Sequence, residues 1–308
     1  MRVVFMGTPL FAVNVLSGLI DNYDVVGVVS QPDKKVGRHQ EIKYTPVKEL
    51  ALKHNIKVLQ PERIKDDYQD IIDLNPDIII TCAYGQIIPK ELLEYPKYGC
   101  INVHASLLPK YRGGAPIHRA IINGDNKTGI TIMYMDEAMD SGDIISQREI
   151  SILDNDNLES VHDKLSLLGK ELLLDTLPSI FSSNNTRIKQ DINEVTYAYN
   201  IKREEEHIDF NKTSKEIFNL IRGLSPLPGS NALIFNQEMK ILDSVILDKE
   251  YDGKCGEIVD VLKEGIVVKT KDSAILITKI KPFGKKVMDA YSYVNGIGKD
   301  KIIGELFL

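Results

Sequence analysis

Short apolar runs, typical of buried strands, alternate with helical segments through the first half of the chain, and this alternation limits the possible folds more than any other feature. The expected strands cover residues 2–6, 25–30, 57–59, 77–82, 101–104, 129–135 and 143–150. The expected helices cover about 9–20, 45–54, 66–74, 89–94 and 116–123, with a long one from about Leu158. Strands that alternate with helices favour a sheet covered on both faces. We therefore predict an α/β domain with a Rossmann-like, doubly wound sheet.

The rest of the chain has a different pattern. Residues 184–206 are polar and rich in Asn, Lys and Glu, as in a connector. A capping-box pattern at residues 213–216 predicts a helix, and β-like runs separated by glycine-containing turns follow at 239–247, 256–261, 265–270 and 274–280. One helix followed by hairpins is typical of a small OB-like barrel, a fold that often binds oligonucleotides. We expect a first domain over residues 1–189, a linker over 190–206 and an OB-like β-barrel domain over 207–308.

The composition excludes several classes of protein. The chain has 43% hydrophobic and 27% charged residues, as ordinary globular proteins do, and no apolar run approaches the ~18 residues of a membrane span. The three cysteines lack the spacing of a metal site or a disulfide framework. The turn after the first strand lacks the glycines of a dinucleotide site, and the net charge of -6 does not by itself suggest a nucleic-acid partner. We expect a cytoplasmic protein with neither a metal nor a prosthetic group.

Two polar side chains stand at the end of the strand expected at residues 101–104. Asn102 and His104 are two residues apart, so they point to the same face of the sheet. An amide donor beside an imidazole suits the stabilisation of an oxyanion and the handling of a proton. The spacing alone also fits a structural role, in which Asn102 caps the strand end and His104 is an interior histidine with satisfied hydrogen bonds.

The residues around this pair resemble the folate-site motif of the formyltetrahydrofolate-dependent formyltransferases, in which Asn-x-His is followed directly by a Ser-Leu-Leu-Pro loop. The matching loop here consists of Ser106, Leu107, Leu108 and Pro109. The third catalytic residue of that family is an aspartate in an Asp-[Thr/Ser]-Gly-Asp setting, and it matches Asp140, which by itself would be read as a turn or capping residue. The resemblance implies that Asn102, His104 and Asp140 are catalytic and that residues 106–109 bind folate.

A second loop, after the strand expected at 77–82, is similar to the family segment that lines the pteridine pocket. Its candidate folate contacts are Tyr84, Gly85 and Gln86. Without the resemblance, this loop would be an ordinary strand-to-helix turn.

The reaction that the resemblance implies moves a formyl group from 10-formyltetrahydrofolate, a co-substrate, to an amine. The amine attacks the formyl carbon and a tetrahedral intermediate forms. Its oxygen accepts hydrogen bonds from Asn102 and His104, while Asp140 orients the imidazole and helps to move the proton.

The identity of the amine rests on two further stretches. Residues 33–43 match the basic insertion with which the tRNA-directed branch of the family grips the acceptor end, and its candidate contacts are Lys34, Lys35, Arg38 and Lys43. Residues 202–210 and 221–229 resemble the entry to that branch's second domain. Leu227 departs from the pattern, because a tryptophan is usual there, and the second domain is nearly neutral. We expect a monomer, without membrane attachment, that acts on the initiator methionyl-tRNA.

Two alternatives stay open. A formyltransferase acting on a nucleotide-sugar amine could also carry a second domain. A non-catalytic folate-binding or RNA-binding protein is disfavoured, because all three chemical positions are intact.

Overall fold

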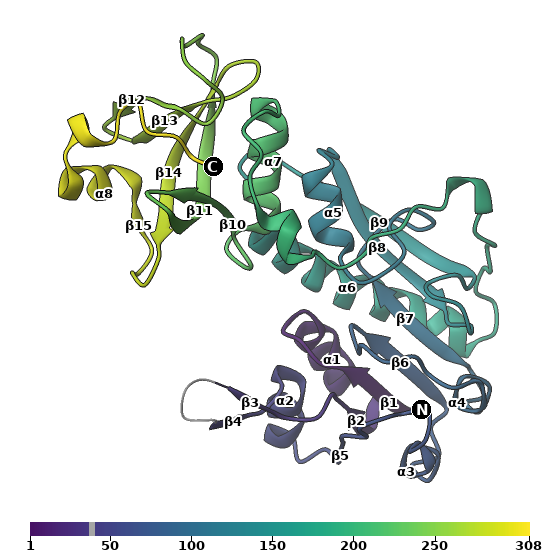
Figure 1. The fold of residues 1–308 in the computed structure, drawn as a ribbon. Helices are drawn as coiled ribbons and strands as arrows, with labels where there is room; N and C mark the ends of the chain where they lie inside the picture. The colour runs from purple at the N-terminus through teal and green to yellow at the C-terminus, as the bar shows by residue number, and fades with distance from the viewer. Residues whose placement is uncertain (37–40) are drawn as a thin grey trace. The chain divides into compact units, whose positions relative to one another are not determined.

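The computed structural model describes residues 1–36 and 41–308, which form two compact units (Figure 1). The first unit comprises Met1–Pro116, Lys127–Ser151 and His162–Ala198. The second unit comprises Ile117–Asn126, Ile152–Val161 and Tyr199–Leu308. This division differs from the ranges 1–189, 190–206 and 207–308 that the sequence suggests. One reason is that residues 196–198 hydrogen-bond to the backbone of Arg112 in the first unit.

The first unit is built on a seven-stranded sheet, counted over the described residues, with the order β5-β2-β1-β6-β7-β8-β9. The parallel strands are β5 (Val58–Leu59), β2 (Asp24–Val29), β1 (Arg2–Gly7), β6 (Ile78–Cys82) and β7 (Cys100–His104). The antiparallel strands are β8 (Lys127–Tyr134) and β9 (Ile144–Ser151). The predicted α/β domain is confirmed, with a sheet that is mixed and mostly parallel.

Helices pack on both faces of this sheet (Figure 1). Val4 and Met6 of β1 face the side covered by α3 (Gln69–Ile72) and α4 (Lys90–Glu94). The other side is covered by α1 (Phe11–Asn22) and α6 (Leu158–Phe181), where Gly169 lies against Val103 of β7. Helix α2 (Pro46–Lys53) packs beside α1. Alternate residues of β1 thus fill two separate core layers, as a doubly wound sheet requires.

A small antiparallel hairpin occupies the basic stretch that the sequence analysis treats as a loop. It consists of β3 (Lys34–Val36) and β4 (Glu41–Lys43), with Lys34 opposite Lys43. Arg38 lies outside the described residues.

The second unit contains an antiparallel sheet with the order β10-β11-β14-β13-β12, and β15 pairs with β14. The strands are β10 (Ser230–Ile234), β11 (Gln237–Leu247), β12 (Ile258–Leu262), β13 (Gly265–Lys269), β14 (Ala274–Pro282) and β15 (Met288–Asp289). The helices are α5 (Pro116–Ile122), most of which belongs to this unit, α7 (Ser214–Leu224) and α8 (Ala290–Ile297). Short 3-10 turns occupy Arg203–Glu206 and Lys299–Lys301 in this unit and Ile192–Glu194 in the first unit. The predicted antiparallel β domain is confirmed, and the predicted capping box of α7 is present.

The last residues of the chain connect the two edge strands of this sheet. Leu308 exchanges two backbone hydrogen bonds with Leu233 of β10. Phe307 donates to Gly256, and Glu305 accepts from Ile258 at the start of β12. The terminal segment therefore joins the ends of the strand order, in the way that a closed barrel requires.

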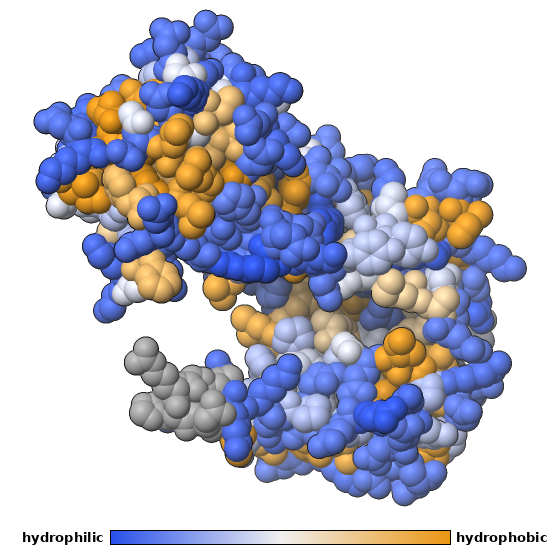
Figure 2. Space-filling view, in the orientation of Figure 1, coloured by the Kyte–Doolittle hydropathy of each residue, from blue (hydrophilic) through white to orange (hydrophobic). Residues whose placement is uncertain are grey.

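The surface of the second unit carries hydrophobic residues among hydrophilic ones (Figure 2). Leu227, which departs from the pattern expected at residues 221–229, is 75% exposed. No helix among the described residues has both the length and the apolar character needed to span a membrane.

Candidate active site

The three residues expected to be catalytic meet in the first unit. Asn102 and His104 lie on β7, between β6 on one side and β8 on the other. Asp140 belongs to the loop that follows β8. The Asn102 Nδ2 atom donates to Asp140 Oδ1 at 3.3 Å, and the His104 Nδ1 atom lies 3.6 Å from Asp140 Oδ2. The strand periodicity thus places the amide and the imidazole on one face, and the loop brings the carboxylate to them.

Asp140 is held on several sides. Its Oδ2 atom accepts a hydrogen bond from the backbone N–H of Gly113 at 2.8 Å. Its backbone has a positive φ of 50°, a conformation that non-glycine residues rarely adopt. Only 15% of its side chain is exposed, against 7% for His104. The carboxylate is therefore largely shielded from water and directed toward the ends of the Asn102 and His104 side chains.

The imidazole of His104 has an oxygen near each ring nitrogen. Its Nε2 atom lies 3.0 Å from the carbonyl oxygen of Tyr111, and this contact is a hydrogen bond when Nε2 carries the proton. The 3.6 Å between Nδ1 and Asp140 is longer than a hydrogen bond. The carboxylate therefore lies beside the ring without locking it. A formyl oxygen that enters the site would compete with these protein acceptors for the same donors.

Thr81 orients the amide of Asn102. The two residues are paired in the β6–β7 ladder, and the Thr81 hydroxyl donates to Asn102 Oδ1 at 2.9 Å. The hydroxyl has a single proton, and its other possible acceptors, Ile101 O and Met135 Sδ, are farther away at 3.3 and 3.2 Å. Because Thr81 engages the amide oxygen, the amide nitrogen points to Asp140. Thr81 was not among the site residues expected from the sequence, although a hydroxyl in the apolar strand Ile78–Cys82 was a signal.

Some of the polar groups and side chains of the Ser-Leu-Leu-Pro loop stabilise the loop itself. Ser106 is buried and donates to the carbonyl of Lys110 at 2.6 Å. Leu108 is buried against Met133 and Ile144, and its N–H donates to Thr131 Oγ1 at 3.1 Å. The side chains of Leu107 and Pro109 are half-buried. The loop can therefore offer a ligand its backbone and these two side chains.

The loop after β6 offers fewer side chains to a ligand than the sequence suggested. The Tyr84 side chain lies in the hydrophobic core, where burial raises its pKa to about 12, and its hydroxyl has no hydrogen-bond partner among the described residues. Gln86 Oε1 accepts from the backbone N–H of Ile64. Gly85 has a positive φ of 91° and is exposed. The backbone around Gly85 is thus the part of this loop best placed for a ligand.

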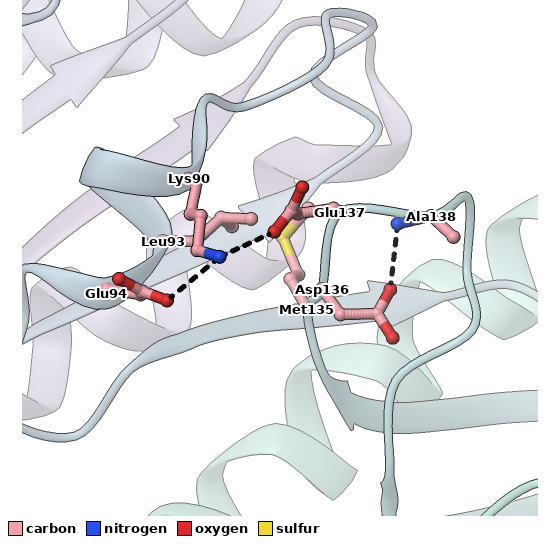
Figure 3. Close-up of a pocket in the computed structure, with 7 residues that line it drawn as sticks. All are labelled: Lys90, Leu93, Glu94, Met135, Asp136, Glu137 and Ala138. Carbon is pink, nitrogen blue, oxygen red and sulfur yellow. Dashed lines mark hydrogen bonds and ion pairs between the residues drawn. The ribbon is translucent and has the colours of Figure 1, made fainter.

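A cavity of about 410 Å³ lies between helix α4 and the loop that follows β8 (Figure 3). It is lined by Lys90, Leu93, Glu94, Met135, Asp136, Glu137 and Ala138. The Lys90 ammonium lies 3.1 Å from Glu137, and this hydrogen bond raises the pKa of Lys90. Met135 links the cavity to the site, because its sulfur contacts the Thr81 hydroxyl. None of these lining residues was expected from the sequence.

The basic hairpin is anchored at both of its ends. The ammonium of Lys48 lies 2.5 Å from Asp33 Oδ2, just before β3, and 4.1 Å from the ring centre of Tyr44, just after β4. Lys34 and Lys43 are exposed and directly opposite each other in the ladder. Like charges in this arrangement destabilise a hairpin, and a bound anion would relieve that repulsion. Lys35, which is also exposed, adds to this positive charge.

Comparisons with known proteins match this chain over most of its length. The family model described as formyl transferase matches residues 1–177, and the model described as formyl transferase, C-terminal domain, matches residues 200–298. The methionyl-tRNA formyltransferase of Bacillus subtilis is 50% identical over 299 residues, which cover 96% of this chain and 94% of that protein.

Solved structures share the fold. The N-formyltransferase from Helicobacter canadensis, in complex with folinic acid and dTDP-3-aminofucose, has a TM-score of 0.67 at 23% identity, and the match covers 92% of this chain and all of that one. HypX from Aquifex aeolicus, in complex with tetrahydrofolic acid, has a TM-score of 0.65 at 17% identity, and the match covers 96% of this chain and 47% of that one.

Proposed function

The chain belongs to the formyl transferase family, and we propose that it is a methionyl-tRNA formyltransferase. It moves the formyl group of 10-formyltetrahydrofolate to the α-amino group of initiator methionyl-tRNA. The observation that carries this proposal is the 50% identity to the Bacillus subtilis enzyme across 96% of the chain, which includes both family domains. The chemistry comes from Asn102 and His104, whose side chains both lie beside the Asp140 carboxylate.

The site can stabilise the intermediate of this transfer. When the amine attacks the formyl carbon, the carbonyl oxygen becomes negative. Asn102 Nδ2 and a protonated ring nitrogen of His104 are donors on one face of β7, where they can reach that oxygen. Removal of one such donor typically costs about 10²–10³ in kcat. Thr81 keeps the amide in the donating orientation.

Asp140 handles the proton of the attacking nitrogen. A free α-amino group has a pKa of ~7.7–8.0, so a useful fraction is neutral near pH 7 and no strong base is needed to start the attack. After the attack, the nitrogen is positive and must lose a proton. The Asp140 carboxylate lies beside the two donors, and it can stabilise this charge and accept the proton directly or through water. The intermediate then collapses: the bond between the formyl carbon and N10 of the folate breaks, N10 takes up that proton, and tetrahydrofolate leaves.

The formyl donor would extend from the cavity of Figure 3 toward Asn102. The cavity has a mixed lining of apolar side chains, carboxylates and the Lys90 ammonium, which suits a flat heterocycle with polar edges. Met135 joins the cavity to Thr81 and hence to Asn102. We propose that residues 84–86 and 106–109 line the path of the folate, largely through their backbone.

The tRNA would be held by charge outside the chemical centre. We propose that Lys34, Lys35 and Lys43 on the hairpin contact its phosphates, together with Arg38, which lies outside the described residues. The antiparallel β domain would bind the body of the tRNA. We further propose that the enzyme acts as a monomer in the cytoplasm, where initiator tRNA is charged.

One assay separates this function from its nearest alternative. Purified protein is incubated with 10-formyltetrahydrofolate and either methionyl-tRNA or a dTDP-linked amino sugar, and the formylated product is measured. Formylmethionyl-tRNA should form with wild-type protein and should be lost with Asp140→Ala. Formylation of the amino sugar alone would overturn the tRNA assignment, and no transfer to either amine would overturn the proposed chemistry.

A further inference from the structure

Gln190 lies close to the catalytic carboxylate, although it is 50 residues farther along the chain. Its side-chain Nε2 atom donates to the backbone carbonyl of Asp140 at 2.8 Å and to the carbonyl of Gly142 at 2.9 Å. One amide group therefore connects both ends of the turn that presents the Asp140 side chain. The sequence suggested only that Gln190 begins a polar connector.

The orientation of this amide is unambiguous. Arg112, which is 7% exposed, donates to Gln190 Oε1 through Nε at 3.0 Å and through Nη2 at 2.8 Å. Arg112 has only donors, so the amide oxygen must face it, and the nitrogen must face the two carbonyls. A cation that engages the oxygen also polarises the amide and strengthens the two bonds made by its nitrogen.

The turn at Asp140 needs such support. Asp140 has a positive φ, which is strained for a residue with a side chain and persists only where the surroundings enforce it. Gly142 leaves no room for adjustment, because a Cβ atom there would lie 2.0 Å from the carbonyl oxygen of Tyr134. On the other side, Asp136 accepts from the N–H of Ala138 and from the hydroxyl of Ser141. Gln190 contacts the backbone of the strained residue itself, whereas Gly113 and Asn102 contact its side chain.

We propose that Gln190 is a positioning residue for the Asp140 carboxylate, held in place by Arg112. This role for Gln190 rests on the proposed function, in which Asp140 is catalytic. By fixing the backbone of residues 140 and 142, Gln190 keeps the carboxylate within reach of Asn102 and His104. Gln190 itself touches neither substrate nor the reacting atoms.

The test compares kcat per folded enzyme for Gln190→Ala, Gln190→Glu and a control, Gln69→Ala. Gln69 is a glutamine of the same unit whose Nε2 atom donates to Asp73 Oδ1, four residues farther along the chain. Gln190→Ala should lower kcat by about 10- to 100-fold, the scale expected when a catalytic group is displaced by roughly 1 Å. Gln190→Glu keeps an oxygen for Arg112 but loses both donors, so its kcat should fall as far while its Tm stays near that of the wild type. Gln69→Ala should leave kcat unchanged.

A double-mutant cycle distinguishes positioning from a general loss of structure. If Gln190 acts through Asp140, adding Gln190→Ala to Asp140→Ala should lower the single-turnover rate by no more than about twofold, because the group that it positions is already absent. Losses that multiply in the double variant would overturn the proposal, as would a Gln190→Glu variant with wild-type kcat. An unchanged rate in Asp140→Ala alone would instead refute the catalytic assignment.

Discussion

Replacement of Thr81 by valine tests whether a single buried hydroxyl sets the direction of the catalytic amide. Valine has nearly the same shape as threonine but cannot donate a hydrogen bond. Thr81 is 3% exposed, and its hydroxyl lies 2.9 Å from Asn102 Oδ1. Without the hydroxyl, the amide oxygen faces a methyl group, and an unpaired buried acceptor costs about 1–3 kcal/mol.

The magnitude of the effect follows from the two contacts that orient this amide. The other contact, from Asn102 Nδ2 to Asp140, is longer at 3.3 Å, so Thr81 supplies the stronger restraint. A complete loss of the oxyanion donor would reduce kcat by about 10²–10³. Because Asp140 still favours the nitrogen over the oxygen, the loss should be partial. We expect Thr81→Val to reduce kcat by about 10- to 100-fold, which corresponds to ~1.4–2.7 kcal/mol.

The measurement is the rate of methionyl-tRNA formylation at saturating concentrations of both substrates, together with the Tm of each variant. Thr81→Ser retains the hydroxyl and should keep most of the wild-type kcat, although it leaves a small cavity. A folded Thr81→Val enzyme with at least half of the wild-type kcat would refute the argument, since the amide would then be oriented without the hydroxyl.

Four further outcomes can be measured. His104→Ala should lower kcat by about 10²–10³ while affinity for a folate analogue is retained; a variant with more than about a tenth of the wild-type kcat would remove the imidazole from the catalytic set. Lys34→Ala should raise KM for methionyl-tRNA at low salt, with an effect that shrinks as salt rises; an unchanged KM at low salt would count against a phosphate contact. Phe307 is 3% exposed, and its ring stacks on Phe210 at 5.8 Å between ring centres. Phe307→Ala should therefore lower the free energy of unfolding, measured in urea, by about 3–5 kcal/mol. The Thr213 hydroxyl, which caps α7, donates to Glu216 and lowers the pKa of that carboxyl. The ionised Glu216 therefore stabilises the second unit above its unfolded pKa of ~4.3, and this stabilisation is lost as pH falls through the folded pKa. The difference in stability between the wild type and Glu216→Gln should vanish in acid.

The sequence by itself predicted the elements whose burial leaves a clear pattern. The strands of the first sheet are buried on both faces, so β1 and β6 appear as continuous apolar runs. The buried apolar residues at helical spacing on α6, such as Val161, Leu165 and Leu172, and the capping box of α7 are equally local signals. The elements that were missed lack such signals. The hairpin strands β3 and β4 have three residues each and consist largely of exposed charged residues, and β15 has two residues. Helix α8 follows directly from β15, and the sequence pattern predicted no element after residue 280.

The same difference applies to the site. The spacing of two residues between Asn102 and His104 determines that they share a face, and this can be read from the strand alone. The part played by Asp140 came from a family resemblance. Thr81 and Gln190 lie 21 and 50 residues from the groups that they hold, and no periodicity connects them. Sheet register decides which residue stands beside Asn102, and the path of the chain after α6 brings an amide to the Asp140 turn. A sequence pattern records which faces are buried, but the direction of a hydrogen bond depends on where distant backbone segments meet, and only the tertiary structure decided that.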